Sequence, residues 1–164
     1  MSEHVSRVVI GTDGASRGNP GRAGWAWVVN PGCWQAGAIP HGTCNEAEIT
    51  AIVRALHAVP DDVPVTILSD SRLCVDTLTK WARGWRAKGW AKADGKPVAN
   101  RPLVEAALTL VERRDAAHGD GHTLIEWVKG HAGHPLNEAA DTFATRAADA
   151  GRGRRVVTGP GWVA

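Results

Sequence analysis

Four carboxylate residues stand where a folded chain could turn them towards one shared site. Asp13 ends an apolar, β-branched segment, and Asp70 directly follows another. Glu48 and Asp141 lie in segments of helical periodicity, each at the edge of the apolar stripe. Carboxylates that face a sheet repel one another and cost several kcal/mol unless they are neutralised. Because Mg²⁺ and Mn²⁺ prefer oxygen ligands, the pattern predicts a site for these cations.

Each carboxylate also has an ordinary alternative. Asp13 precedes Gly14, and an Asp-Gly pair is typical of turns. Glu48 and Asp141 could be solvated residues on helix surfaces. Residue types and spacing alone therefore leave both interpretations open.

The composition sets the class of protein. The chain has 164 residues, 43% of them hydrophobic, with 19 Lys and Arg against 17 Asp and Glu and a formal charge of +2. It contains no apolar run of about 18 residues and no N-terminal secretory pattern. Three scattered cysteines without CxxC spacing disfavour a disulfide framework or a thiolate zinc site. We therefore expect a free-standing cytoplasmic protein, a monomer with no obligate protein partner.

The segments between these residues predict the elements that must position them. Strands are expected at Val5–Asp13, Trp25–Val29 and Cys33–Ile39, an antiparallel meander, and then at Val63–Ser69 and Thr123–Val128. Helices are expected at Asn45–Val59, after a Ser71 cap with Leu73, Leu78 and Trp81 on its apolar face, at Arg101–Arg114 and at Leu136–Ala148. This order predicts an α/β fold in which helices flank a mixed sheet.

Basic residues are concentrated between positions 80 and 101, where only Asp94 opposes them and Trp81, Trp85 and Trp90 are interleaved. Such a protruding segment can contact phosphates, while indoles lie against a sugar backbone. Trp81 and Trp85, four residues apart, could instead pack the helix. We expect Trp81 in the core and leave Trp85 open.

Residues 1–150 are expected to form a single domain, since no internal repeat or long linker divides them. Residues 151–164 are rich in Gly and Arg and are expected to form a flexible basic tail, in which Arg152, Arg154 and Arg155 could add weak phosphate contacts.

Four segments resemble, in order and spacing, the signature segments of bacterial-type (type 1) ribonuclease HI: TDGASRGNPGRAGWAWVV, TCNEAEITAIVRAL, ILSDSRLCVDTL and WVKGHAGHPLNEAADTFA. The resemblance runs from about Arg7 to Ala148. It implies the ribonuclease H-like fold, a five-stranded mixed sheet of an antiparallel meander followed by parallel strands. It also implies endonucleolytic hydrolysis of RNA paired with DNA, giving 5′-phosphate and 3′-hydroxyl ends, and removal of RNA primers and R-loops in the cell.

The same resemblance implies roles for individual residues. Asp13, Glu48, Asp70 and Asp141 match the family's ligands for two Mg²⁺ ions, with Mn²⁺ possible as a substitute. Two cations about 4 Å apart can activate a water and stabilise the leaving oxygen. His131 matches a mobile histidine that assists proton transfer or product release. A zinc site formed by His131 with His134 is disfavoured, because zinc needs three or four nitrogen or sulfur ligands and the cysteines lie elsewhere.

Further residues are expected to bind the hybrid. The Gly14–Gly21 loop and the start of the following helix match segments that contact RNA 2′-hydroxyls and phosphates, and the basic protrusion matches one that grips the DNA strand. Cys44 stands where many bacterial members have Asn, and Arg72 where Gln is common; both changes leave the metal ligands untouched. The expected nucleic-acid-binding residues are Gly14, Ser16, Gly18, Asn19, Thr43, Asn45, Arg72, Arg83, Trp85, Arg86 and Lys88.

Three other functions remain as rivals. A DNA-cutting junction resolvase or integrase of the same fold shares acidic residues of this kind, but the segments GNPG and VKGHAGHP do not favour it. A catalytically silent hybrid-binding module is disfavoured, because such a module would not need all four carboxylates. A structural cation-binding domain leaves the basic segment unexplained.

Overall fold

The computed structural model describes residues 6–150 and 156–158, which form a mixed sheet with the strand order β5-β4-β1-β2-β3-β6. β1 pairs antiparallel with β2, and β2 with β3, while β4 and β5 run parallel to β1. The five predicted strands and their mixed arrangement are thereby confirmed. Their bounds are β1 Val8–Ser16, β2 Gly21–Asn30, β3 Cys33–Gly42, β4 Val65–Ser69 and β5 Thr123–Trp127.

The first strand is longer than its sequence predicted. We expected it to end at Asp13, but β1 continues to Ser16 because β2 keeps pairing with it up to Ser16↔Ala23. On its other side β1 pairs with β4 only as far as Thr12↔Ser69. β1 therefore extends past the end of β4, and Asp13 lies at the start of this unpaired edge.

A sixth strand, β6 Val156–Thr158, pairs antiparallel with β3. It lies inside the segment 151–164 that we expected to be a flexible basic tail, an expectation that stays a prediction. The β-branched sequence of β6, Val-Val-Thr, suits a strand at the edge of a sheet. Arg152, Arg154 and Arg155 lie outside the described residues.

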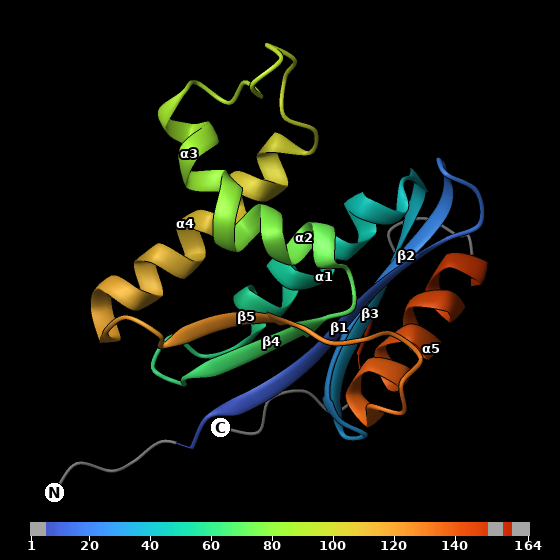
Figure 1. Ribbon diagram of the computed structural model, residues 1–164. Helices are drawn as coiled ribbons and strands as arrows, with labels where there is room; N and C mark the ends of the chain where they lie inside the picture. The colour runs from blue at the N-terminus through green and yellow to red at the C-terminus, as the bar shows by residue number, and fades with distance from the viewer. Residues whose placement is uncertain (1–5, 151–155, 159–164) are drawn as a thin grey trace, which may run out of the picture.

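Helices cover the sheet from both sides, as predicted. α1 (Cys44–Ala58) packs on β1 and β2 and against α4 (Arg101–His118), whereas α5 (Pro135–Ala150) packs on β1, β2 and β3 from the opposite face (Figure 1). The larger core lies under α1 and α4 and includes Ile10, Ile52 and Leu56, which are almost fully buried. None of the described helices is long and apolar enough to cross a membrane.

The helical segment after β4 exposes a different face from the one predicted. It runs through α2 (Arg72–Asp76), the π-helical turn η1 (Thr77–Trp81) and α3 (Ala82–Ala87). Ser71 caps it, as expected, by accepting a hydrogen bond from the backbone N–H of Cys74. Leu73 and Trp81, which we expected on the apolar face, are 52% and 41% exposed. The buried positions include Cys74, Leu78 and Ala82, a row of residues four apart that packs against the core, so Leu78 is buried as expected.

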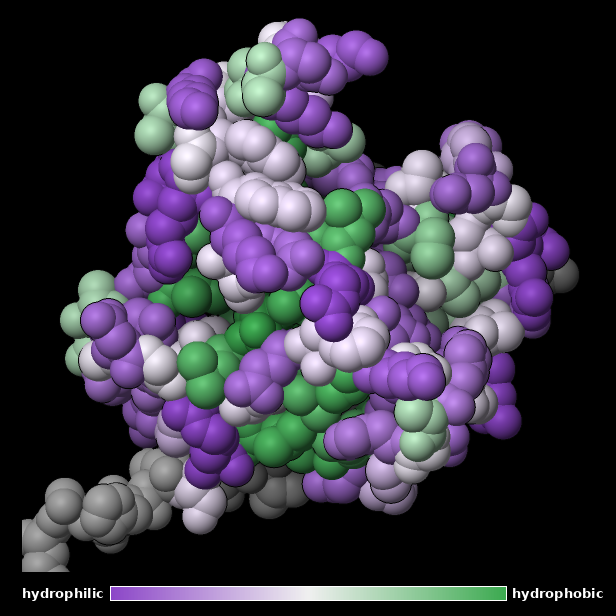
Figure 2. Space-filling model, in the orientation of Figure 1, coloured by the Kyte–Doolittle hydropathy of each residue, from purple (hydrophilic) through white to green (hydrophobic). Residues whose placement is uncertain are grey.

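α3 and the chain that follows it project away from the sheet (Figure 1). Hydrophilic side chains gather on this projection, whereas an apolar surface lies lower on the same side of the molecule (Figure 2). Val9 of β1 and Leu124 of β5 are 40% and 37% exposed. The basic segment of residues 80–101 is thus a protrusion, as predicted.

A buried arginine joins the ends of α4, β4 and β5. Arg114, 1% exposed, donates to Thr123 Oγ1 at 2.8 Å, to the carbonyl of Pro60 at 3.1 Å and to the carbonyl of Val63 at 2.6 Å. These acceptors lie in chain segments that enter the two parallel strands. Removing the guanidinium leaves Thr123 Oγ1 and the Val63 carbonyl without this donor, whereas the Pro60 carbonyl still accepts from the Val63 N–H at 3.0 Å.

We therefore expect Arg114→Ala to lower the free energy of unfolding by about 3 kcal/mol in urea denaturation. Arg113→Ala is the matched control, because the Arg113 side chain is 62% exposed and its ion pair with Asp61 spans 3.6 Å. The control should change stability by less than about 0.5 kcal/mol. Equal losses in the two variants would contradict a special role for Arg114.

Candidate active site

Three of the four predicted carboxylates meet where β1 extends past β4. Ser69 pairs with Thr12, so Asp70 and Asp13 are the next residues along two adjacent parallel strands. Glu48 reaches the same point from α1. Ligand oxygens of Asp13, Glu48 and Asp70 all lie within 4.8 Å of one another. We call this group the carboxylate cluster.

Gly14 brings α1 close enough for Glu48 to join the cluster. A Cβ at Gly14 would collide with the backbone nitrogen of Glu48 and would lie 2.6 Å from the carbonyl carbon of Ala47. Only glycine permits this approach of strand and helix. Gly14 is itself buried, and its expected contact with nucleic acid stays a prediction.

Burial makes the cluster electrostatically costly. Asp13 and Glu48 are 3% and 6% exposed. The pKa of Asp13 is raised to about 8, chiefly by burial and also by the charge of Asp70, against the opposing effect of hydrogen bonds from Glu48 and from the Gly14 N–H (2.9 Å). Burial, and then the charge of Asp13, raises the pKa of Glu48 well above its usual value. Without a cation, the pair therefore retains a proton at neutral pH.

Asp141 approaches the cluster from the opposite face of the sheet. It is half-buried on α5, and an interaction with its side chain raises the pKa of Asp13. It does not belong to the group of three whose oxygens lie within 4.8 Å. α1 and α5 thus supply Glu48 and Asp141 from the two sides of the sheet.

The donor set fits a hard divalent cation. All of its ligand atoms are carboxylate oxygens. Glu48 Oε2 is buried and, among the described residues, has no hydrogen-bond partner, which leaves a lone pair free for a cation. The described residues hold no other group of three potential ligands, so the alternative zinc site with His131 and His134 gains no support.

His131 lies on the loop that passes this cluster. A Cβ at the preceding Gly130 would lie 2.9 Å from Asp70 Oδ2, so the loop backbone runs directly against that carboxylate. His131 is exposed and has a φ of 54°, in the left-handed region. The fold therefore brings His131 beside the cluster.

The glycine-rich loop is tied to the start of α1. Asn19 Oδ1 accepts from the backbone N–H of Cys44 at 3.1 Å, and the Thr43 hydroxyl caps α1 by accepting from Glu46 at 3.0 Å. Gly18 and Asn19 are exposed, in keeping with their expected contacts. Ser16 Oγ is buried and has no hydrogen-bond partner among the described residues, and its expected contact with the hybrid stays a prediction.

Cys74 forms a hydrogen bond with Asn45, a residue that we expected to bind the hybrid. Its buried thiol donates to Asn45 Oδ1 at 3.1 Å, and burial raises the pKa of this thiol to about 12, so it stays protonated as a donor. Because the oxygen of Asn45 accepts this bond, its amide NH₂ is free to donate outwards. The sequence contained no signal for this pairing, since the two residues are 29 positions apart.

The tryptophans of the protrusion reverse our expectation. Trp81, which we expected in the core, is 41% exposed and tilts against Trp85 with their ring centroids 5.9 Å apart. Trp85 packs partly against the core, and Trp90 is 7% exposed. Trp81 is therefore better placed than Trp85 to lie against a nucleic-acid backbone.

The expected cations of the protrusion are exposed, but they are not equally free. Arg86 forms a two-bond ion pair with Glu112 of α4, with N–O distances of 2.5 and 3.2 Å. Within residues 6–150, Arg83 and Lys88 make no ion pair. These two residues are therefore the better candidates for phosphate contacts.

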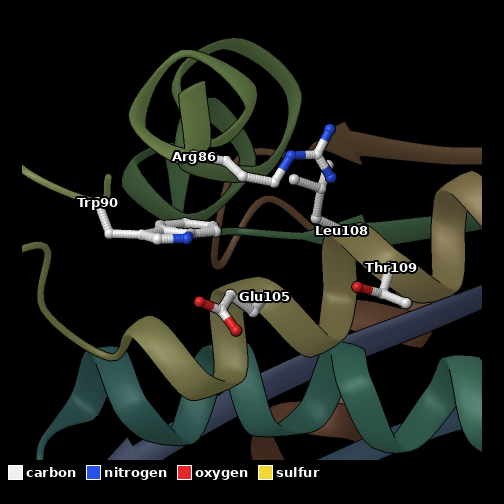
Figure 3. Close-up of a pocket in the computed structure, with 5 residues that line it drawn as sticks. All are labelled: Arg86, Trp90, Glu105, Leu108 and Thr109. Carbon is white, nitrogen blue, oxygen red and sulfur yellow. The ribbon is translucent and has the colours of Figure 1, made fainter. Parts of the chain in front are cut away.

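A pocket separates the protrusion from α4 (Figure 3). Arg86 and Trp90 lie on one side of it, and Glu105, Leu108 and Thr109 on the other. Its volume is about 210 Å³, below the roughly 300 Å³ at which sites for small ligands begin. No cluster carboxylate lines it, so it marks where the protrusion rests on α4.

Comparison with known proteins points to one family. The RNase H family model matches residues 5–149. The chain is 42% identical to the Ribonuclease H of Tropheryma whipplei (strain Twist) over 159 residues, 96% of this chain and 94% of that protein. It is 42% identical to the Ribonuclease HI of Streptomyces coelicolor over 149 residues, 87% of this chain and 62% of that one. The solved N-terminal RNase H domain of a Mycobacterium tuberculosis protein superimposes with a TM-score of 0.64 at 30% identity, covering 88% of this chain and 95% of that one.

The raised pKa of Asp13 predicts how stability depends on pH without metal. An unfolded Asp titrates near pH 3.9, whereas Asp13 in the folded protein titrates at about 8. Between these values the folded state binds more protons than the unfolded state, so stability falls as pH rises through that window. The Asp13→Asn variant has no titrating carboxyl group at this position. In chelator at pH 8 the variant should be about 1–3 kcal/mol more stable than the parent, and near pH 4 the two should agree.

Asp149→Asn serves as the control in the same urea denaturation series. Asp149 pairs with Arg17 on the surface, and this bond lowers its pKa, so its removal should not stabilise the protein at pH 8. If the Asp13 variant loses stability with rising pH as steeply as the parent, the cluster is not electrostatically strained.

Proposed function

The chain belongs to the ribonuclease H family, and from that premise we propose that it is an endonuclease that uses the carboxylate cluster to hydrolyse the RNA strand of RNA–DNA hybrids. One observation carries the assignment of the site: the buried carboxylates of Asp13 and Glu48 meet the half-buried carboxylate of Asp70 at a single point, and one Glu48 oxygen has no partner among the described residues. Such a group requires cations, and cations there can act on a phosphodiester.

We propose that Asp13, Glu48, Asp70 and Asp141 together hold two Mg²⁺ ions, for which Mn²⁺ can substitute. Bound cations supply an activated water and stabilise charge on the leaving oxygen. Gly14 and the end of β4 hold Glu48 and Asp70 at fixed positions, so the cluster is formed before substrate arrives. The oxygen of water bonds to phosphorus and the bond to the 3′-oxygen breaks, which leaves a 5′-phosphate and a 3′-hydroxyl.

We propose that His131 assists proton transfer or product departure. The leaving 3′-oxygen must gain a proton, and an imidazole can supply one near neutral pH. The support is positional: the backbone next to His131 touches Asp70, and the side chain itself is exposed. A histidine placed in this way can reach the cleaved strand without being one of the buried ligands.

We propose that the hybrid lies across the cluster between two surfaces. The loop carrying Gly18 and Asn19, with the start of α1, offers polar groups to the minor groove of the hybrid, where the RNA 2′-hydroxyls are displayed. On the other side the basic protrusion offers phosphate contacts. The residues proposed for contact are Ser16, Gly18, Asn19, Thr43, Asn45, Arg72, Arg83, Trp85, Arg86 and Lys88, to which we add Trp81.

We further propose that residues 1–150 act as one ribonuclease H domain, a cytoplasmic monomer with no obligate protein partner that removes RNA primers and R-loops. The family match over residues 5–149 supports the single domain. Cys33, Cys44 and Cys74 are free thiols, in keeping with a reducing compartment.

A substrate panel tests the proposed reaction. Pure protein is offered RNA–DNA hybrid, duplex DNA, duplex RNA and single-stranded RNA with Mg²⁺, with Mn²⁺ and with chelator. We expect cleavage of the hybrid's RNA strand alone, and none in chelator. Equal cutting of duplex DNA would indicate a resolvase, and hybrid binding without cutting would indicate a silent binding module.

Asp70→Asn should lower turnover by at least about 10³-fold while hybrid binding persists, because the change removes one cation ligand without altering shape. Asp149→Asn, on the exposed part of α5, is the matched control and should leave the rate unchanged. Residual activity of the Asp70 variant within tenfold of the parent would exclude this residue from the metal site.

The protrusion makes a separate prediction about salt. Replacing Arg83 and Lys88 together with Gln should weaken hybrid binding and reduce the slope of log K against log salt by about 2, since each phosphate contact contributes about 0.9. The control replaces Arg54 and Arg113, two exposed cations outside the protrusion, in the same way. If both double variants keep the parental slope, the protrusion does not contact phosphate.

A further inference from the structure

Arg72 has a fixed position beside the carboxylate cluster. It follows Asp70 by two residues and begins α2 directly after the Ser71 cap. Its guanidinium carbon lies 4.2 Å from the ring centroid of Trp127, so the cation stacks on the indole. A side chain that is exposed and yet stacked on a ring loses little further conformational freedom when it binds a ligand.

Trp127 is in turn held to the strand that carries Asp70. It is the last residue of β5 and pairs in parallel register with Ser69. Its indole Nε1 donates to the backbone carbonyl of Asp70 at 3.2 Å. The ring is nevertheless 40% exposed, so its outer face is open to solvent. The indole therefore places the guanidinium of Arg72 at a set distance from the cluster.

The donors of Arg72 are free. Over the described residues, Arg72 makes no ion pair and donates no side-chain hydrogen bond, although a guanidinium carries five N–H groups. Stacking occupies only the face of the guanidinium and leaves its edges open for a bidentate contact, the geometry that phosphate oxygens match.

The two other arginines that stack on tryptophan rings among the described residues lack this combination. Arg101 lies 5.5 Å from the Trp90 ring, but it also pairs with Glu105. Arg54, which belongs to α1, lies 5.1 Å from the Trp25 ring. It lies beside residues of β3 and away from the cluster. Only the cation on Trp127 both keeps its donors and borders the cluster.

We propose that Arg72 binds a phosphate of the RNA strand next to the one that is cut, and that Trp127 is the positioning residue that holds it there. The inference rests on the proposed function and adds a specific subsite to it. Because the guanidinium is held next to Asp70, it lies on the path of the strand whose phosphate the cluster receives. The surrounding carboxylates disfavour a phosphate there, and a fixed cation offsets that repulsion.

The test measures hybrid affinity in chelator, where no cleavage occurs, across a range of salt. Arg72→Gln should raise Kd about tenfold and reduce the salt slope by about 0.9. Trp127→Ala should weaken binding nearly as much as Arg72→Gln. Trp127→Phe, which keeps an aromatic face, should stay within about threefold of the parent. The double variant Arg72→Gln/Trp127→Ala should bind no more weakly than Arg72→Gln alone, since the second residue acts through the first.

Arg54→Gln is the matched control, a stacked exposed arginine of equal charge, and should bind like the parent. Neutral methylphosphonates in the DNA strand should leave the effect of Arg72→Gln intact, because the contact is with RNA. Circular dichroism and Tm establish that each variant is folded. If Trp127→Ala fails to fold, the Trp127→Phe and Arg72→Lys variants still test the proposal. Trp127→Phe keeps the aromatic face, and Arg72→Lys loses only the bidentate edge of the guanidinium.

Parental binding by Arg72→Gln, or additive losses in the double variant, would overturn the inference. So would disappearance of the Arg72→Gln effect on the hybrid with a neutral DNA strand. These outcomes are separate from failure of the proposed function, in which the parent protein itself does not cut the hybrid.

Discussion

Repulsion among buried carboxylates is the constraint on which this molecule depends. Asp13 and Glu48 are almost fully buried, and with Asp70 their oxygens lie within 4.8 Å of one another. Burial of Asp13 and Glu48 limits how far water can relieve the repulsion, and no protein cation pairs with the group among the described residues. What remains is a proton, which the raised pKa of Asp13 reflects, or divalent cations. The strain is thus the source of the site's affinity for metal.

The surrounding fold fixes the group in place and prepares its borders. β1 extends past β4, α1 approaches over Gly14, and α5 brings Asp141 from the other face. Around this point the surface changes character. Exposed cations follow on the protrusion, and Arg72 stacks on Trp127 at the rim. An anionic strand is therefore attracted by the borders, while its reacting phosphate meets a centre that is unfavourable to it until cations are bound.

Much of this could be predicted from the sequence, and the failures have physical causes. Strands, helices and caps follow local periodicity and capping chemistry, so the five strands and the Ser71 cap were predictable. The end of β1 was not, because β2 prolongs it by pairing. The exposure of Leu73 and Trp81 was not predictable either, because the helix turns the smaller residues Cys74 and Ala82 towards the core instead. The four carboxylates were identified through their flanking segments, but the contacts of Cys74 with Asn45 and of Trp127 with Arg72 arise only on folding.

Proton release on metal binding tests the central claim most directly. Calorimetric titration of the protein with Mg²⁺ or Mn²⁺ at pH 7, in two buffers of different ionisation enthalpy, gives the number of protons released per protein. If the cluster retains a proton until a cation replaces it, about one proton should be released at pH 7, and the number should fall towards zero above pH 9. Cation binding without proton release at pH 7, or no binding at all, would contradict the account.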